Sequence, residues 1–154
     1  MKISTELAEQ EILLQLSARA RTTKPLISVV EGGESDRDCL LSLIESDHPE
    51  VTLHEVDLTR FDSLAQALTR VFGDDESHDP VRVWRHTAVR DDLVLINGAD
   101  RMSTDDVELF WLTVYRGFEK APMIVLSGRP GLSELLAHDE FEPGRHFTVL
   151  RISD

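Results

Sequence analysis

Residues 26–41 read Leu-Ile-Ser-Val-Val-Glu-Gly-Gly-Glu-Ser-Asp-Arg-Asp-Cys-Leu-Leu, and the rest of the 154-residue chain is organised around them. A short apolar run, Leu26 to Val30, is followed by a glycine pair and a polar turn. Apolar residues then recur at helical spacing as far as Ile44. This order predicts a strand, a loop and a helix, which is the layout that surrounds a phosphate-binding loop.

The residues of this loop differ from those that hold a nucleotide. In the motif G-x-x-x-x-G-K-[ST], backbone N–H groups surround the phosphates, the lysine reaches the β/γ-phosphates and the hydroxyl contacts magnesium. Gly32 and Gly33 are present, but Asp38 and Cys39 stand where the lysine and the hydroxyl are expected. The turn also carries Glu31, Glu34, Asp36 and Asp38, with Arg37 as the cation among them. Because carboxylates repel a polyphosphate, we predict a nucleotide-binding fold whose nucleotide site is degenerate.

Composition indicates one soluble domain over residues 1–154, which we expect to be cytoplasmic. Sixteen basic and twenty-nine acidic side chains give a formal net charge of −13, which disfavours non-specific binding to nucleic acid and to anionic membranes. No apolar run approaches the roughly 20 residues of a membrane span, so we expect no membrane insertion.

The single cysteine, Cys39, excludes an internal disulfide, and its place on an apolar helix face predicts a buried, inert thiol.

Hydrophobic periodicity predicts alternating strands and helices along the whole chain. Helices are expected at 3–20, at 36–45, from Thr59 or Asp62 to 72, from Ser103 to 118 and at 132–137. The expected N-caps are Ser4 or Thr5 for the first helix and Ser35 or Asp36 for the second. In the fourth helix, Asp106 is expected to complete a capping box with Ser103. Strands are expected at 26–30, 51–56, 93–96, 123–126 and 147–152. Strands separated by helices predict right-handed crossovers and a parallel three-layer α/β/α sandwich of five strands.

Four segments together bring a family into view, namely 26–44, 51–72, Leu93-Val-Leu-Ile-Asn-Gly-Ala-Asp-Arg-Met-Ser103 and Met123-Ile-Val-Leu-Ser-Gly-Arg-Pro-Gly-Leu-Ser-Glu-Leu-Leu136. The chain resembles the AAA-type P-loop ATPases of the ExeA-like secretion and transposition group. In that group the Walker B strand is followed by Asp-Glu, and a later strand ends in a polar residue before Gly-x-Pro-x-Leu. The resemblance covers about Leu7 to Ile152 and implies a P-loop NTPase-like fold with a mostly parallel sheet, here without the helical lid domain.

The chain departs from this family at the residues that carry its chemistry. Asn97-Gly98 stands where the resemblance places Asp-Glu, whose aspartate would hold the magnesium shell and whose glutamate would orient the attacking water. With the Walker A lysine also absent, the resemblance implies a pseudo-ATPase. We therefore expect no catalytic residue, no cofactor, no metal and no enzymatic activity.

Two positions of the family pattern are kept. Ser127 falls where the family has its sensor-1 polar residue, and Arg145 falls where AAA proteins carry an arginine finger. Each also has a plainer interpretation, since Ser127 fits a strand-ending turn and Arg145 fits a surface arginine.

Other candidate residues are open to two interpretations. Trp111 and Tyr115 share one helix face, where they either fill the core or form an exposed aromatic surface for a partner. The acidic segment 73–80 is expected to be a solvated loop, since it has neither the spacing nor the central glycine of a calcium loop. Arg82, Arg85 and Arg90 fit no motif and are expected to form a solvated charged face.

Three functions fit these residues, in decreasing order of support. The first is a protein-interaction scaffold or regulatory adaptor. The second is an accessory subunit of an active ATPase that supplies Arg145 in trans. The third is a small-ligand sensor that uses the vacated cleft at the carboxyl ends of the strands, where open α/β sheets bind ligands.

Overall fold

A computed structural model describes residues 2–18, 26–72, 92–116, 123–136 and 147–153. The elements, in chain order, are β1 (Lys2–Ile3), α1 (Thr5–Ala18), β2 (Leu26–Glu31), α2 (Glu34–Asp47), β3 (Thr52–Asp57), α3 (Leu64–Phe72), β4 (Asp92–Asn97), the 3₁₀ helix η2 (Ala99–Arg101), α5 (Thr104–Arg116), β5 (Met123–Gly128), α6 (Leu132–Leu136) and β6 (Thr148–Ile152). None of the helices in these ranges is long and apolar enough to cross a membrane.

One parallel sheet forms the middle layer, with the strand order β1-β6-β2-β5-β4-β3. Within the residues that the structure describes, the sheet has six strands where the sequence predicts five. The additional strand is β1, a two-residue segment whose Lys2 and Ile3 pair with Arg151 and Ile152 at the edge of the sheet. Two residues carry no periodicity, so this strand has no signal in the sequence and forms only because β6 offers it an open edge.

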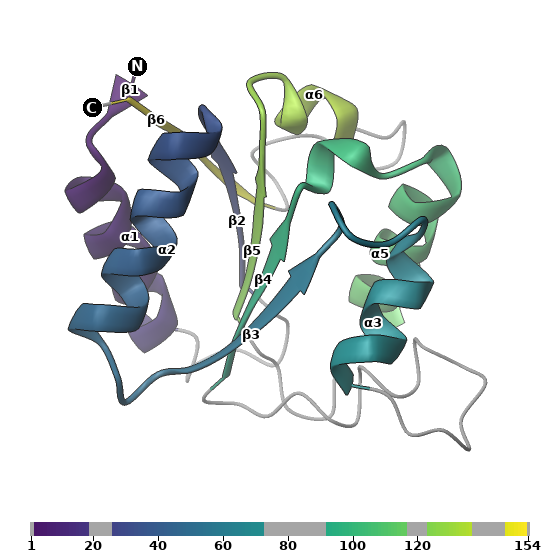
Figure 1. The fold of residues 1–154 in the computed structure, drawn as a ribbon, viewed down its shortest axis with the longest axis horizontal. Helices are drawn as coiled ribbons and strands as arrows, with labels where there is room; N and C mark the ends of the chain where they lie inside the picture. Colours follow the sequence, from purple (N-terminus) through teal and green to yellow (C-terminus); the bar gives the residue numbers. More distant parts are fainter. Residues whose placement is uncertain (1, 19–25, 73–91, 117–122, 137–146, 154) are drawn as a thin grey trace.

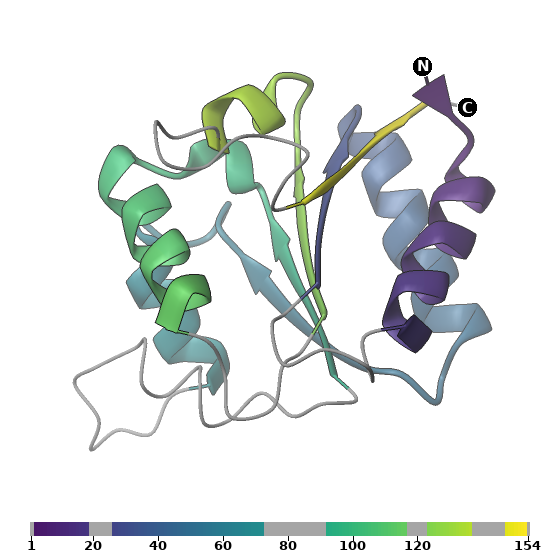
Figure 2. The same cartoon turned by 180° about the vertical axis from the view of Figure 1, so that it is seen from behind.

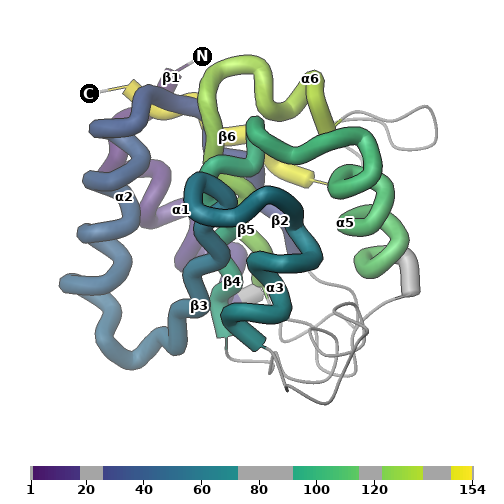
Figure 3. Tube along the Cα trace, turned by 45° about the vertical axis from the view of Figure 1, so that its right-hand side comes forward, coloured from purple at the N-terminus to yellow at the C-terminus, as the bar shows by residue number. Residues whose placement is uncertain are grey.

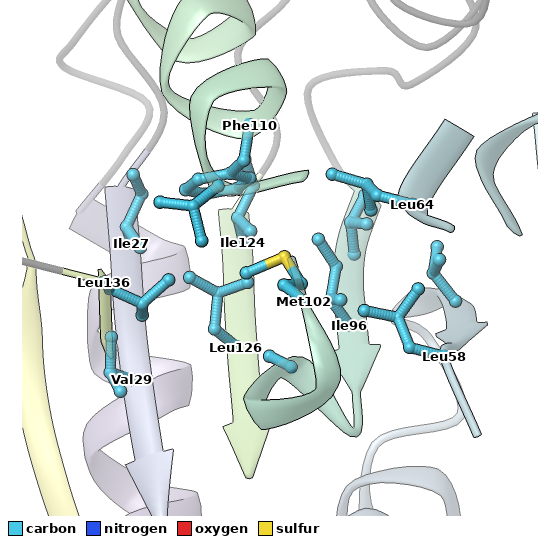
Figure 4. Packing of buried hydrophobic residues seen from close by; sticks show 14 of the residues in the cluster. Ile27, Val29, Leu58, Leu64, Ile96, Met102, Phe110, Ile124, Leu126 and Leu136 are labelled. Atoms are coloured by element: carbon cyan, nitrogen blue, oxygen red, sulfur yellow. The ribbon is translucent and has the colours of Figure 1, made fainter. Parts of the chain in front are cut away.

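Helices cover both faces of the sheet, which confirms the predicted three layers (Figures 1 and 2). Buried apolar residues of α1 and α2 pack on one face, and those of α3, α5 and α6 pack on the other. Figure 4 shows the second of these cores, in which Val29, Ile96 and Leu126 of the central strands meet Leu64 and Phe110 of the helices. The central strands are buried on both faces, as their nearly continuous apolar runs predict.

Helix α5 begins as predicted, whereas α2 and α3 begin at other residues than predicted. The capping box of α5 is confirmed, since Asp106 N–H donates to Ser103 Oγ and Ser103 N–H donates to Asp106 Oδ2, both at 3.2 Å. By contrast, α2 begins directly after Gly33, which caps it without a side-chain hydrogen bond, so the prediction of Ser35 or Asp36 as N-cap is wrong. Helix α3 likewise begins later than predicted, at Leu64, with Ser63 Oγ accepting a hydrogen bond from Gln66 N–H.

Two side chains lie in environments that settle alternatives left open by the sequence. Trp111 is 2% exposed, its ring stacks on Phe147 and its Nε1–H donates to the Leu136 carbonyl at 3.0 Å. An exposed partner surface at Trp111 is therefore wrong, and core filling is correct, because α5 must bury this face on the sheet. The side chain of Tyr115 lies outside the described residues. Cys39 is exposed, so the prediction of a buried thiol is also wrong.

Candidate functional site

The carboxyl ends of the parallel strands meet at one edge of the sheet. There Asn97 of β4 pairs with Asp57 of β3 on one side and with Ser127 of β5 on the other. Strand β2 lies between β5 and β6, while the chain that leaves it crosses to β3 at the far edge. This is the topological position at which open α/β sheets bind ligands. Figure 3 shows α1 and α2 on one side of these strands and α3 and α5 on the other.

The link from β2 to α2 consists of Gly32 and Gly33 alone. Gly32 N–H donates to the Gly128 carbonyl at 3.1 Å, which ties the link to the end of β5. A Cβ at Gly32 would lie 2.6 Å from Cγ1 of Ile152, so the close approach of β6 requires glycine here. The chain therefore passes from β2 to α2 through two glycines and forms no wide loop between them.

Arg37 is held across the carboxyl ends by two hydrogen bonds to neutral oxygens. Its Nε–H donates to the Gly32 carbonyl and its Nη1–H donates to Asn97 Oδ1, each at 3.1 Å. The guanidinium thus joins the turn after β2 to the end of β4. The sequence showed Arg37 as a cation in an acidic turn but not this contact, because the two partners are 60 residues apart.

A cleft of about 650 Å³ opens at this edge of the sheet. Its lining is formed by Glu34, Arg37 and Asp38 of α2, Glu55 and Asp57 of β3, Thr59 after β3, Asn97 of β4, Gly98 after β4, Asp100 and Arg101 of η2, and Arg129 after β5. Five carboxylates and three guanidinium groups therefore face one space. In the part of the chain that the structure describes, none of the three guanidinium groups lies within ion-pair distance of a carboxylate.

Sequence reasoning missed Arg101 and Arg129. Each follows the carboxyl end of a predicted strand within one short turn, at β4 and at β5. Because side chains that follow parallel strands gather at one edge of the sheet, that position is the signal which could have identified both arginines.

Glu31 does not belong to the cleft, although the sequence grouped it with the carboxylates of the turn. It is 4% exposed and faces α6, where its Oε1 accepts a hydrogen bond from Gly131 N–H and its Oε2 accepts bonds from the N–H and Oγ–H of Ser133. Burial by itself raises the pKa of Glu31, but the Ser133 hydroxyl, the two backbone N–H groups and the charge of Arg151 together lower it. Glu31 is thus a charged structural anchor and does not repel ligands in the cleft.

The opposite shift occurs at the β3 side of the cleft. Partial burial and the nearby charges of Asp57, Glu45 and Asp38 raise the pKa of Glu55, and the opposing effect of Arg60 is smaller. Negative charge is therefore concentrated between α2 and β3.

The remaining predicted site residues are placed as follows. Of the residues predicted to form a degenerate nucleotide site, Asp38, Asn97 and Gly98 line the cleft, whereas Gly32 and Gly33 are not part of its lining. Ser127 is buried at the end of β5 beside Asn97 and is not part of the lining. Arg145, the acidic segment 73–80 and the arginines at 82, 85 and 90 lie outside the described residues. Within the described ranges, no three His, Cys, Asp or Glu side chains are grouped so that they could hold a metal ion.

Comparisons with known proteins place the fold. No family model matches the chain. No curated protein matches its sequence. Among solved structures, the T158V variant of RuvB from Thermotoga maritima superposes with a TM-score of 0.58 at 15% identity, covering 99% of this chain and 46% of that one. The Aeropyrum pernix ORC2 protein, in ADPNP and ADP complexes, superposes with a TM-score of 0.56 at 12% identity, covering 96% and 46%.

These likenesses concern the fold alone, because the identities are low and this chain spans less than half the length of either protein. RuvB and ORC2 are AAA+ P-loop ATPases, and the chain shares their P-loop NTPase-like fold. The narrower resemblance to the ExeA-like group stays a prediction.

Proposed function

We propose that this chain is an AAA-type domain that does not hydrolyse nucleotide and that acts by binding other proteins. The observation that carries the proposal is the direct turn from β2 into α2, closed by Arg37 across Gly32 and Asn97. A phosphate-binding loop of about eight residues encloses phosphates with a series of backbone N–H groups. Here two glycines replace that loop, and the N–H of Gly32 already bonds to Gly128.

The end of β4 supports the same conclusion. Asn97 and Gly98 provide no carboxylate for a magnesium shell or for orienting water. The amide oxygen of Asn97 is engaged by Arg37, and Gly98 has φ of +73°, a conformation that favours glycine over a side chain such as glutamate. The chain therefore replaces both catalytic carboxylates with residues that serve a tight turn and an internal hydrogen bond.

The protein-binding part of the proposal is supported by the surface of α1. Leu7 and Leu14 are 49% and 66% exposed and lie seven positions apart, on one face of the helix. Beside them a groove of about 580 Å³ runs between α1 and α2, lined by Leu13, Leu14 and Leu43 with acidic residues that include Glu6 and Asp47. Exposed leucines in an acidic rim suit an amphipathic partner helix with basic residues.

Calorimetric titration tests the first part of the proposal. ATP and ADP with magnesium are titrated into the full chain, and hydrolysis is followed under the same conditions, with an active AAA ATPase as the positive control. We expect neither binding nor turnover. Micromolar affinity for ATP, or turnover that Asn97→Ala abolishes, would overturn the proposal.

Two matched surface variants test the second part. Leu14→Lys places a charge in the α1–α2 groove, whereas Leu112→Lys alters a leucine of α5 that is 46% exposed on the other side of the sheet. Both are compared with the unchanged chain for binding a designed Leu/Lys amphipathic peptide and for proteins that co-purify from native extract. We expect Leu14→Lys alone to lose binding; equal retention by both variants would contradict the proposed surface.

The cleft supports a second candidate function, a small-ligand sensor. A space of about 650 Å³ with charged groups of both signs has the size and the converging polar groups of a ligand site. The role of Arg145 as a residue supplied in trans to an active ATPase stays a prediction. It is tested by whether Arg145→Ala lowers the turnover of a reconstituted partner ATPase.

A further inference from the structure

We propose that protonation of His48 regulates the α1–α2 groove, so that a basic partner helix binds while His48 is neutral and binds more weakly once it is protonated. This inference rests on the proposed protein-binding surface and adds a regulation to it. It follows from the contacts of both ring nitrogens of His48 and from the charges that line the groove.

His48 lies where α2 ends, next to α1. It follows the last residue of α2 directly, its backbone N–H donates to the Ile44 carbonyl at 3.1 Å, and its side chain lines the α1–α2 groove. Figure 1 shows the two helices side by side on one face of the sheet. The His48 side chain is 26% exposed. A proton can therefore reach the imidazole and leave it without any opening of the fold.

Both ring nitrogens of His48 face carboxylates. Nε2 lies 2.9 Å from Oε1 of Glu9 on α1, and Nδ1 lies 3.4 Å from Oε1 of Glu50 in the turn after α2. A neutral imidazole has one N–H and can donate to only one of them, whereas the imidazolium donates to both. The Glu9 side chain is 10% exposed, and a buried carboxylate needs a donor, while that of Glu50 is 70% exposed. The neutral ring therefore keeps its bond to Glu9, and protonation adds the contact with Glu50.

The other charged groups of the groove are carboxylates. Glu6 and Glu9 of α1 and Asp47 of α2 line it together with His48, and no lysine or arginine belongs to this lining among the residues that the structure describes. Carboxyl groups ordinarily titrate at about pH 4 and imidazole at about pH 6.5, so near neutral pH the charge of the lining is controlled by His48. The three lining carboxylates give a charge of −3 while His48 is neutral and −2 once it is protonated.

This change of charge acts on the partner proposed for the groove. Leu13, Leu14 and Leu43 provide apolar contacts that no proton alters. A basic side chain of the partner is attracted by the carboxylates and repelled by an imidazolium beside them. Binding of a basic helix and protonation of His48 therefore oppose each other, and the affinity should rise with pH as His48 loses its proton.

Titration of a designed Leu/Lys amphipathic peptide into the full chain tests this regulation, at about pH 5.5 and at about pH 8, on either side of the ordinary titration of histidine. Both ends of the peptide are blocked, so its charge is the same in the two buffers. A Leu/Gln peptide of the same pattern is the uncharged control. We expect the Leu/Lys peptide to bind about three- to tenfold more tightly at the higher pH, with a smaller difference at high salt, and the Leu/Gln peptide to show no difference.

The same substitution at two histidines locates the effect. His48→Gln keeps an amide N–H that can donate to Glu9 but carries no charge, so this variant should bind the Leu/Lys peptide equally tightly at both pH values. His54→Gln is the matched control, because the ring of His54 contacts Phe72 of α3 on the other face of the sheet, and it should keep the pH dependence. Circular dichroism and unfolding midpoints confirm that both variants are folded. A pH dependence that persists in His48→Gln would overturn the inference.

The failures of the two proposals can be told apart. If the Leu/Lys peptide binds with the same affinity at both pH values and Leu14→Lys abolishes this binding, the proposed surface stands and its regulation by His48 is wrong. If the peptide binds at neither pH, the proposed surface falls together with its regulation.

Discussion

The carboxyl end of β2 borders two polar regions whose charges are partnered in opposite ways. On the α6 side, Glu31 is buried, and its carboxylate accepts three hydrogen bonds from Gly131 and Ser133. On the α2 side, the cleft carries five carboxylates and three guanidinium groups with few contacts among them. The shifts of pKa follow this difference, since that of Glu31 is lowered and that of Glu55 is raised.

The comparison distinguishes a charged side chain that stabilises the fold, Glu31, from the charged side chains of the cleft, which are available to bind a ligand. A buried carboxylate is tolerated only when hydrogen bonds replace the water it has lost, so Glu31 must be a fixed part of the structure. Half-exposed charges keep their water, cost little and gain from a ligand of opposite sign. Substitutions on the two sides should therefore have different consequences.

Glu31→Ala should give the largest loss of stability. The change leaves the N–H and Oγ–H of buried Ser133 and the N–H of Gly131 without their acceptor, and we expect a loss of about 2–3 kcal/mol in the free energy of unfolding. Urea denaturation at neutral pH measures it. Glu34→Ala, an exposed carboxylate of the same turn, is the control and should stay within about 0.5 kcal/mol. Equal losses in the two variants would remove the distinction between the two sides.

The pH dependence of stability should sharpen the same comparison. Because the pKa of Glu31 is lowered from its ordinary value of 4.5, its contribution is fully present above that value and is lost as pH falls through the lowered folded-state pKa. The stability difference between the unchanged chain and Glu31→Gln should therefore narrow on acidification below about pH 4.5. A difference that is constant with pH would contradict an ionised anchor.

Loss of the Arg37 contact should have an intermediate effect. Arg37→Met keeps most of the apolar stem but removes the donors to Gly32 and Asn97, and we expect a loss of about 1 kcal/mol. Arg60→Met is the control, because this side chain is 80% exposed and its pairing with Asp57 lies at the surface. Unfolding curves that show the same small change for both variants would mean that Arg37 does not hold the link closed.

Glu55→Gln should give the smallest change, and in the opposite direction. Its raised pKa means that protonation favours the folded state, so the unchanged chain gains stability as pH falls through that raised pKa, and the variant lacks this gain. At neutral pH we expect Glu55→Gln to be more stable by a few tenths of a kcal/mol, less at high salt, because the group is exposed. Destabilisation by this variant would mean that Glu55 has a favourable partner.

The sequence predicted the fold well where a local rule governs. The β2 and β5 runs are nearly continuously apolar and form central strands, and Ser103 with Asp106 forms the predicted capping box. It failed where a distant element decides, as at β1, which pairs with the adjacent β6. At Trp111 the sequence left two alternatives open, and contacts with Leu136 and Phe147 decide for the core.

The candidate site shows the same division. The absence of lysine after Gly33 and of carboxylates at Asn97-Gly98 is read directly from the sequence, and the proposed loss of nucleotide chemistry begins from it. The sequence could not decide that Glu31 turns away from the cleft, that Arg37 reaches Asn97, or that Arg101 and Arg129 face the same space as Asp38. Side-chain identity is local, whereas the partner of a charge depends on which strands lie side by side. Folding of the whole sheet therefore decided which charges are anchored and which stay available.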